Sequence, residues 1–152
     1  MAAAVATRSA RMGPVKQMRP GEANEVASVE LVVGGDAVDP EGLTELTGIE
    51  ASRGWKKGDV YSSRSGQQLA RPWGIWAVTR SGADVEEVAC ALLRVVELQF
   101  ESIRAAADIA KATITIGIWW QPPEGQGGFS LRAPLLRRLV AICERVDVYL
   151  PG

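Results

Sequence analysis

The sequence predicts an α+β domain in which helices cover one face of a four- or five-stranded, mostly antiparallel sheet. Segments with the alternating period of strands and segments with the helical period take turns along the chain. The two longest helical segments, 81–98 and 130–146, each carry one apolar stripe that a common sheet would bury. The segment 113–119 pairs an isoleucine face with a threonine face, which disfavours a wholly parallel sheet. The expected architecture is a ferredoxin-like two-layer sandwich.

The first strand is expected at residues 27–36, where apolar side chains alternate before a Gly-Gly pair. Residues 39–48 then predict a short helix. Asp39 can cap its start, Pro40 fits its first position, and Gly48 supplies a left-handed stop.

The segment GIEASRGWKKGDVY, residues 48–61, has neither a strand nor a helical period and is predicted to be a shaped connector. Trp55 is expected to insert into the fold, while Gly58 and Asp59 turn the chain. This turn would present Lys56 and Lys57 to solvent at a fixed place. The sequence leaves open whether the connector is also a contact surface.

Residues 62–72 are expected to form a polar loop after a brief strand pairing, and residues 73–80 to form the next strand. The helix at 81–98 has a capping-box-like start in which Asp84 is the cap. The segment 99–108 either continues this helix or begins a new one after a bend.

The last third of the chain predicts a strand, a helix and a final strand. Residues 112–120 alternate strongly, so their isoleucines share one face. Residues 130–146 predict a helix capped by Ser130, and residues 146–150 predict a short closing strand.

The composition limits the possible functions. The 152-residue chain has a net charge of −1 and a pI near 5.6, which disfavours a protein built mainly to hold nucleic acid. It has no histidine, which is the commonest general base and metal ligand. Cys90 and Cys143 are far apart and lack metal-ligand spacing. We therefore expect no enzyme activity, no catalytic residue, no cofactor and no metal, and we interpret the cysteines as buried thiols.

Residues 1–25 are expected to form a flexible tail ahead of a single domain at 26–152. The tail has basic residues but lacks the apolar core of a secretory signal, and an organellar transit peptide is the alternative. The chain has no apolar run near the roughly 18 residues of a membrane span. We therefore expect a cytoplasmic protein without a membrane segment.

The five tryptophans are the most informative side chains. Trp76 and Trp119 lie opposite isoleucines on their strands, so both are expected on the sheet face that the helices leave uncovered. Trp55 could fold across the edge of this face. The rings form either a second small core under the connector or a partly exposed groove that binds a partner. On the second interpretation, the candidate partner-binding residues are Trp55, Lys56, Lys57, Trp76 and Trp119.

Three segments occur in a characteristic order: LTELTGIEASRGWKKGD, then WGIWAVT, then GGFSLRAPLLRRLVAICERVDVYL. In this order they resemble a bacterial family catalogued as a domain of unknown function, number 4279, and the resemblance covers about residues 28–150. The matching positions are Thr44, Gly48, Trp55, Gly58, Asp59, Trp76 and Tyr149. The resemblance implies a small stand-alone cytoplasmic protein that binds without catalysis, and some members are suspected immunity proteins beside toxins.

The leading functional hypothesis is a non-enzymatic protein-binding domain, with neutralisation of a bacterial toxin as its concrete form. The alternative is a module that binds a small molecule or single-stranded nucleic acid. In that case Trp76, Trp119 and the nearby lysines would stack against bases or sugar rings. The identity of the partner and the oligomeric state stay open.

Overall fold

The computed structural model describes residues 26–122 and 127–151. The main sheet contains β1 (Val26–Gly35), β2 (Arg53–Trp55), β5 (Gly74–Gly82), β6 (Thr113–Gln121) and β7 (Arg145–Tyr149). The helices are α2 (Pro40–Thr47), α3 (Val85–Val96), α4 (Phe100–Ala110) and α5 (Ala133–Ile142), with the short 3₁₀ turn η2 (Glu97–Gln99) between α3 and α4. The strands β3 (Val60–Ser62) and β4 (Gln68–Ala70) form a separate hairpin. The tail expected at residues 1–25 lies outside the described residues.

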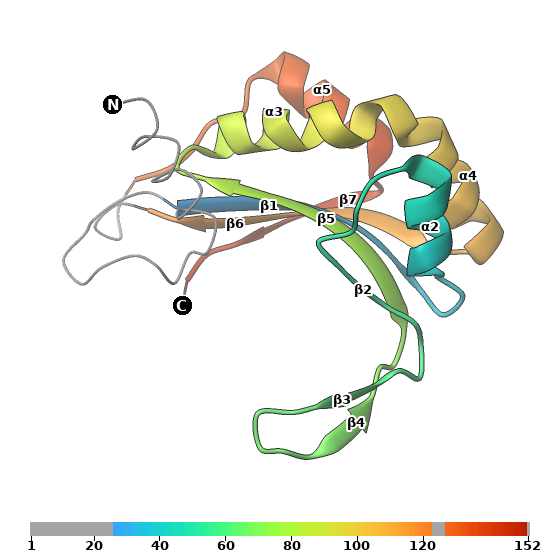
Figure 1. Ribbon diagram of the computed structural model, residues 1–152. Coiled ribbons are helices and arrows are strands. Elements are labelled where there is room, and N and C mark those ends of the chain that lie inside the picture. The colour runs from blue at the N-terminus through green and yellow to red at the C-terminus, as the bar shows by residue number, and fades with distance from the viewer. Residues whose placement is uncertain (1–25, 123–126, 152) are drawn as a thin grey trace, which may run out of the picture.

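The five strands lie in the order β2-β5-β1-β6-β7, and the helices cover one face of the sheet (Figure 1). The neighbours β2–β5, β5–β1 and β1–β6 are antiparallel, whereas β6 and β7 are parallel. The strands β2, β5, β1 and β6, with the helices that connect them, follow the ferredoxin-like split βαβ pattern. The expected two-layer α+β fold is confirmed, and α5 is the crossover that adds β7.

Local sequence signals explain the start of α3 and the end of α2. The Asp84 carboxylate accepts a hydrogen bond of 2.9 Å from the Glu87 N–H at the start of α3. Gly48 ends α2 with φ of 71°, which only glycine adopts without strain. The turn η2 separates α3 from α4, so the segment after α3 begins a new helix rather than continuing the old one.

The last helix is shorter than the 130–146 expected from its apolar stripe. It begins at Ala133 because the proline at 134 fits only its first turn, and Arg132 rather than Ser130 is the N-cap. It ends at Ile142 because Cys143 already has extended backbone angles that lead into β7.

The core lies between the helices and the sheet face that they cover. Every second residue of β1 and β6 points into it, and the three β6 isoleucines lie there as expected. The largest wholly buried side chains include Leu31, Trp76, Leu92, Leu93, Ile103, Ile116, Ile118 and Leu139. The two layers therefore share one core on one side of the sheet, and none of the described helices covers the opposite side (Figure 1).

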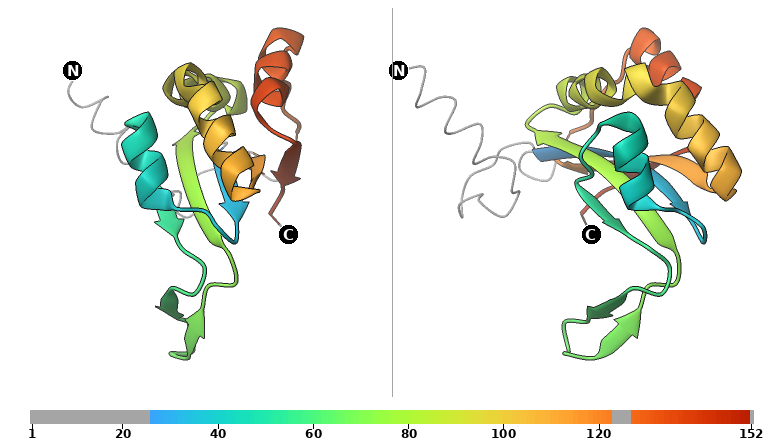
Figure 2. Two further views of the ribbon diagram at one scale, coloured as in Figure 1. Left: turned by 90° about the vertical axis from the view of Figure 1, so that its right-hand side faces the viewer. Right: turned by 45° about the vertical axis from the view of Figure 1, so that its right-hand side comes forward.

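The hairpin of β3 and β4 projects from the sheet on the side away from the helices (Figures 1 and 2). The polar loop expected at residues 62–72 is therefore wrong for residues 68–70, which form β4. Gly66, with φ of 84°, allows the tight turn that brings β4 back to β3. The Arg71 guanidinium lies 3.7 Å from the ring centroid of Trp55 and 3.8 Å from that of Tyr61. These cation–π contacts join the hairpin to β2.

Candidate binding site on the open sheet face

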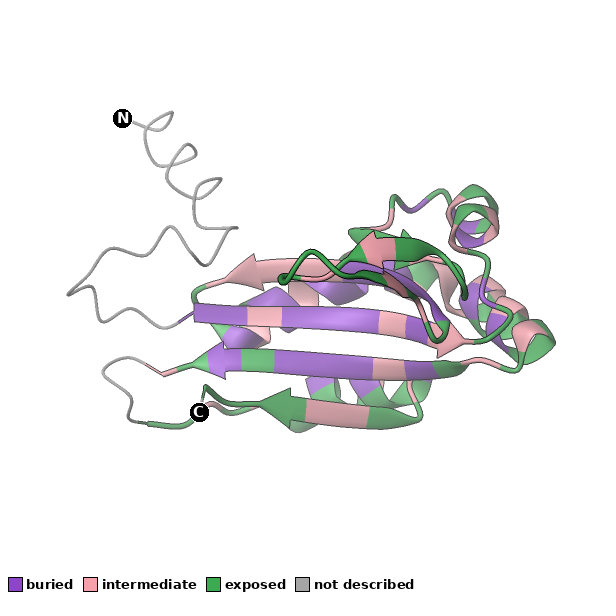
Figure 3. Cartoon of the chain, turned by 90° about the horizontal axis from the view of Figure 1, so that it is seen from below, coloured by how far each residue is buried: buried purple, intermediate pink, exposed green. Residues whose placement is uncertain are grey.

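We call the sheet face opposite the helices the open face. Figure 3 shows the sheet from this side, with the central strands mostly buried and the edge strand β7 more exposed. The open face carries the side chains that alternate with the core residues. Its side chains include Glu30, Val32, Arg53, Ile75, Thr79, Thr113, Thr115, Trp119, Arg145, Asp147 and Tyr149.

An aromatic pair forms one end of the open face. The rings of Trp119 on β6 and Tyr149 on β7 are stacked, with centroids 4.7 Å apart and an interplanar angle of 15°. The Trp119 ring also lies over Gly117, because a Cβ added to this glycine would come within 2.7 Å of ring carbons. The two side chains remain 38% and 44% exposed, so the pair offers a flat aromatic surface to a ligand.

Gly117→Ala is expected to displace the Trp119 ring and cost about 1 kcal/mol of stability, because the ring tip is movable but tightly placed. Near-ultraviolet circular dichroism should show the loss of the Trp119–Tyr149 stack. Gly34→Ala is the matched control on the same face, since its added Cβ would find its nearest neighbours at an ordinary 3.9 Å. An unchanged aromatic signal in Gly117→Ala would contradict this placement of the ring.

An ion pair between a buried carboxylate and a half-exposed guanidinium lies in the middle of the open face. The Glu30 carboxylate accepts hydrogen bonds of 2.9 and 2.6 Å from Nε and Nη2 of Arg53, and one of 2.8 Å from the Thr79 hydroxyl. The side chain of Glu30 is 5% exposed and that of Arg53 is 47% exposed. The hydrogen bonds to Glu30 raise the pKa of Arg53. The pair thus fixes two charges in the floor of the face and neutralises them there.

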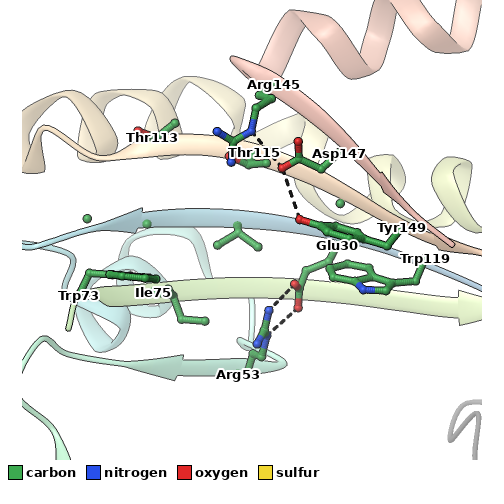
Figure 4. A pocket seen from close by; sticks show the side chains of 14 residues that line it. Glu30, Arg53, Trp73, Ile75, Thr113, Thr115, Trp119, Arg145, Asp147 and Tyr149 are labelled. Atoms are coloured by element: carbon green, nitrogen blue, oxygen red, sulfur yellow. Dashed lines mark hydrogen bonds and ion pairs between the residues drawn. The ribbon is translucent and has the colours of Figure 1, made fainter. Parts of the chain in front are cut away.

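A shallow hollow of about 400 Å³ lies between the aromatic pair and Trp73 (Figure 4). Trp73 is 54% exposed and precedes β5 at the far end of the hollow. Thr113 and Thr115 line the stretch between the two ends. From Thr113 to Trp119 the strand runs roughly 20 Å, which is the length of about six extended residues. The hollow therefore presents aromatic rings at both ends of a polar, charge-paired floor.

The family model described as "Domain of unknown function (DUF4279)" matches residues 24–150. The chain belongs to this family. The resemblance seen in the three sequence segments is thereby confirmed, and every open-face residue named above lies inside the DUF4279 region. Neither a curated protein nor a solved structure matches the chain.

The structure places Trp76 and Trp119 of this DUF4279 domain on opposite faces of the sheet. Trp119 lies on the open face, where the sequence places it. The placement of Trp76 there is wrong, because its side chain is wholly buried on the helix-covered face. Its Nε1–H donates a 3.0 Å hydrogen bond to the Thr44 hydroxyl of α2. Trp76 is therefore a core residue and cannot contact a partner.

Trp55 is half-buried at the edge of the sheet, in β2. Its Nε1–H donates a 3.1 Å hydrogen bond to the carbonyl oxygen of Trp73, and Arg71 covers its ring. The ring thus joins β2, the hairpin and the chain before β5. These contacts give Trp55 a structural role at the edge of the sheet.

Lys56 and Lys57 are exposed, but each has an acidic neighbour. Lys56 Nζ lies 3.5 Å from an Asp39 carboxylate oxygen, and Lys57 Nζ lies 2.9 Å from one of Asp36. The two lysines therefore tie residues 48–61 to the chain just before α2, and they do not form a free positive patch.

The sequence did not point to three important residues of the site, Glu30, Arg53 and Trp73. One signal was available, because Glu30 is the single charged side chain in the apolar strand segment VASVELVV. A charge at such a position requires a partner when it is buried. Tyr149 appeared only as a position shared with the DUF4279 family.

The two thiols of the described domain are free cysteines, and each is partly buried. Burial raises the pKa of Cys143, and its thiol donates to the Leu139 carbonyl oxygen at 3.2 Å. A neutral, hydrogen-bonded thiol is a poor nucleophile. Within residues 26–122 and 127–151, no group of three His, Cys, Asp or Glu residues could hold a metal ion, and no helix is long and apolar enough to cross a membrane.

Proposed function

We propose that this DUF4279 domain is a non-enzymatic binding domain that takes a protein partner on its open face. The observation that carries the proposal is the pair of exposed aromatic ends around the hollow, Trp73 at one and Trp119 with Tyr149 at the other. Aromatic side chains of this kind are the common anchors of protein interfaces, since they bury large areas with few rotatable bonds.

The charges of the open face favour a protein over a nucleic acid. Arg53 is paired with Glu30, and Nε of Arg145 lies 3.0 Å from an Asp147 carboxylate oxygen. A phosphate backbone binds chiefly through unpaired cations. It would have to break these ion pairs, whereas a neutral or apolar protein segment would leave them intact. The partner expected is therefore an uncharged surface or extended segment with apolar side chains at both ends.

The absence of enzyme activity is part of this proposal. The chain has no histidine, and the charged groups of the hollow are paired with one another rather than aimed at a common point. Catalysis needs a base or nucleophile directed at a reacting atom. The paired polar groups of the open face better suit shape and charge complementarity than chemistry.

Toxin neutralisation in the cytoplasm is the specific form of the proposal that the family resemblance suggests. An inhibitor of this kind needs only a stable binding face. The free cysteines suit a reducing compartment. Co-expression with the product of a neighbouring toxin-like gene, scored as rescue of growth, tests this specific form separately from binding itself.

Site-specific photo-crosslinking tests the binding face directly. A benzoylphenylalanine at Thr115, in the floor of the hollow, is expected to crosslink one defined protein in the native host. The same group at Leu98, which is 89% exposed on the helix side, is the matched control and should not capture that protein. The captured protein is then purified and its Kd for the domain measured by calorimetry.

Trp73→Ala combined with Tyr149→Ala should weaken this Kd at least about thirtyfold, since each anchor is expected to be worth more than about 1 kcal/mol. Leu98→Ala should leave it unchanged. Equal crosslinking from Thr115 and Leu98, or an unchanged Kd in the double variant, would remove the open face as the binding surface.

A small molecule is the second candidate, and the size of the hollow supports it. About 400 Å³ falls inside the range of ligand pockets, roughly 300–1,000 Å³. In that case native mass spectrometry of the domain purified from its host would show a bound small mass. This mass would be lost in Trp119→Ala, and position 115 would yield no crosslinked protein.

A further inference from the structure

The strand β7 leaves one edge of the sheet without a strand partner among the described residues. The Ile114 carbonyl oxygen accepts a 2.9 Å hydrogen bond from the Glu144 N–H just before β7, so Ile114 and, by alternation, Ile116 and Ile118 face β7. In a parallel ladder such a residue bonds to the two residues that flank its register partner, and the partner of Ile116 is Val146. Arg145, Asp147 and Tyr149 are therefore bonded inward to β6, and Val146 and Val148 direct their backbone N–H and C=O groups away from the sheet.

An apolar strip follows this edge on the helix side. On α5, Arg138 is hydrogen-bonded to Glu97 of η2, which defines the flank that faces α3 and α4. Leu136 and Val140 lie one turn apart on the opposite flank, where they are 40% and 57% exposed. Val148 of β7 points to the same side and is 50% exposed. Figure 2 shows α5 above β7 at one margin of the sheet.

The β7 edge is short and carries two charged side chains, but it lacks the proline, lysine and bulge that commonly prevent strand pairing. Its sequence, RVDVY, contains no proline and no lysine, and the β6–β7 register is unbroken. Proteins usually protect an exposed edge with such residues, with bulges or with a covering segment. An edge that none of the described strands covers, beside exposed apolar side chains, has the properties of an interface.

We propose that two copies of this chain pair antiparallel through β7 in a symmetric dimer. Residues opposite each other must lie on the same face of the sheet, which limits the registers. A twofold axis at Val146 places Arg145 opposite Asp147 of the partner subunit, and by symmetry the reverse pair forms as well. A twofold axis at Asp147 would instead oppose two aspartates. The charge order along β7 is thus complementary to its own antiparallel copy, which identifies a second copy as the occupant.

The same arrangement places the helix-covered sides of the two copies side by side. Val146 lies opposite its own counterpart, Val148 lies opposite Glu144 of the partner subunit, and the exposed Leu136 and Val140 of α5 lie on this side of both copies. The two sheets would join into one continuous sheet. This proposal concerns the edge of the sheet and does not depend on the function proposed for the open face.

Sedimentation equilibrium of the full chain tests the dimer. The expected mass is twice the 16.3 kDa of one chain. Arg145→Glu would place two negative charges opposite each other at both 145–147 pairs across the axis, and Asp147→Arg would place two positive charges there. Each variant alone should therefore dimerise about tenfold more weakly or worse. Mixing the two variants restores opposite charges at both pairs, and the mixture should form heterodimers with near wild-type affinity.

Val140→Lys should also weaken the dimer, whereas Ile109→Lys, at a site 86% exposed on α4, is the matched control and should not. Melting curves establish that each variant is folded. If a single variant does not fold, the double variant R145E/D147R still places opposite charges across the axis and should stay dimeric. Adding Val140→Lys to this double variant should dissociate it. A monomeric wild type, a dimer insensitive to all these changes, or two monomeric variants that fail to associate on mixing would each overturn the proposal.

Discussion

Trp76→Ala is expected to lower the free energy of unfolding by about 3–5 kcal/mol, as emptying a buried site of this size does. The side chain is wholly buried on the helix-covered face and holds α2 through the Thr44 hydroxyl. Removing the ring leaves a cavity and breaks the one side-chain hydrogen bond recorded between β5 and α2. Urea denaturation followed by circular dichroism measures the loss.

Two control substitutions separate the contributions to this loss. Trp73→Ala removes the same ring at a site 54% exposed and should cost less than about 1 kcal/mol. Trp76→Phe keeps most of the packing but loses the hydrogen bond, so its loss of stability should lie between those of Trp73→Ala and Trp76→Ala. Similar losses for Trp73→Ala and Trp76→Ala would mean that β5 presents the other face to the helices.

Arg53→Met is expected to cost about 3 kcal/mol, because it leaves the Glu30 carboxylate nearly buried without its cation. This value is at the low end for a broken buried pair, since Arg53 is half-exposed and water can enter where its guanidinium was. The Thr79 hydroxyl would be the one remaining side-chain donor to the carboxylate. Chemical denaturation at neutral pH checks the value.

The double variant Glu30→Leu with Arg53→Met is the informative comparison. Replacing both members of a buried pair by apolar groups is often neutral or stabilising, so the double variant should recover most of the loss. Arg138→Met is the matched control, because it breaks a similar two-bond pair with Glu97 at the exposed surface and should cost about 1 kcal/mol or less. A double variant as unstable as Arg53→Met would show that packing, rather than the stranded charge, causes the loss.

The alternation of side chains along β6 was enough to predict both of its faces, because one face carries three isoleucines and therefore had to be buried. The same reasoning failed for β5. There, alternation correctly grouped Ile75 with Thr79 and set Trp76 apart, but both groups contain apolar residues. Which group meets the helices depends on the pairing of β5 with β1, where Trp76 lies opposite Val33.

The polar part of the site depends on contacts between distant residues. Glu30 and Arg53 are 23 residues apart and meet because β1 and β2 both flank β5. Lys57 and Asp36 are 21 residues apart and meet because the connector returns past the end of β1. No local period encodes such pairs, so the sequence could predict an aromatic sheet face but not the paired charges within it.

The hairpin of β3 and β4 is a separate two-stranded sheet whose recorded stacking contacts to β2 pass through one guanidinium, that of Arg71. It projects on the same side as the open face (Figure 1). A unit attached in this way can change its length or sequence without altering the register of the main sheet. We therefore expect the hairpin to tolerate changes of length and sequence better than the strands of the main sheet do.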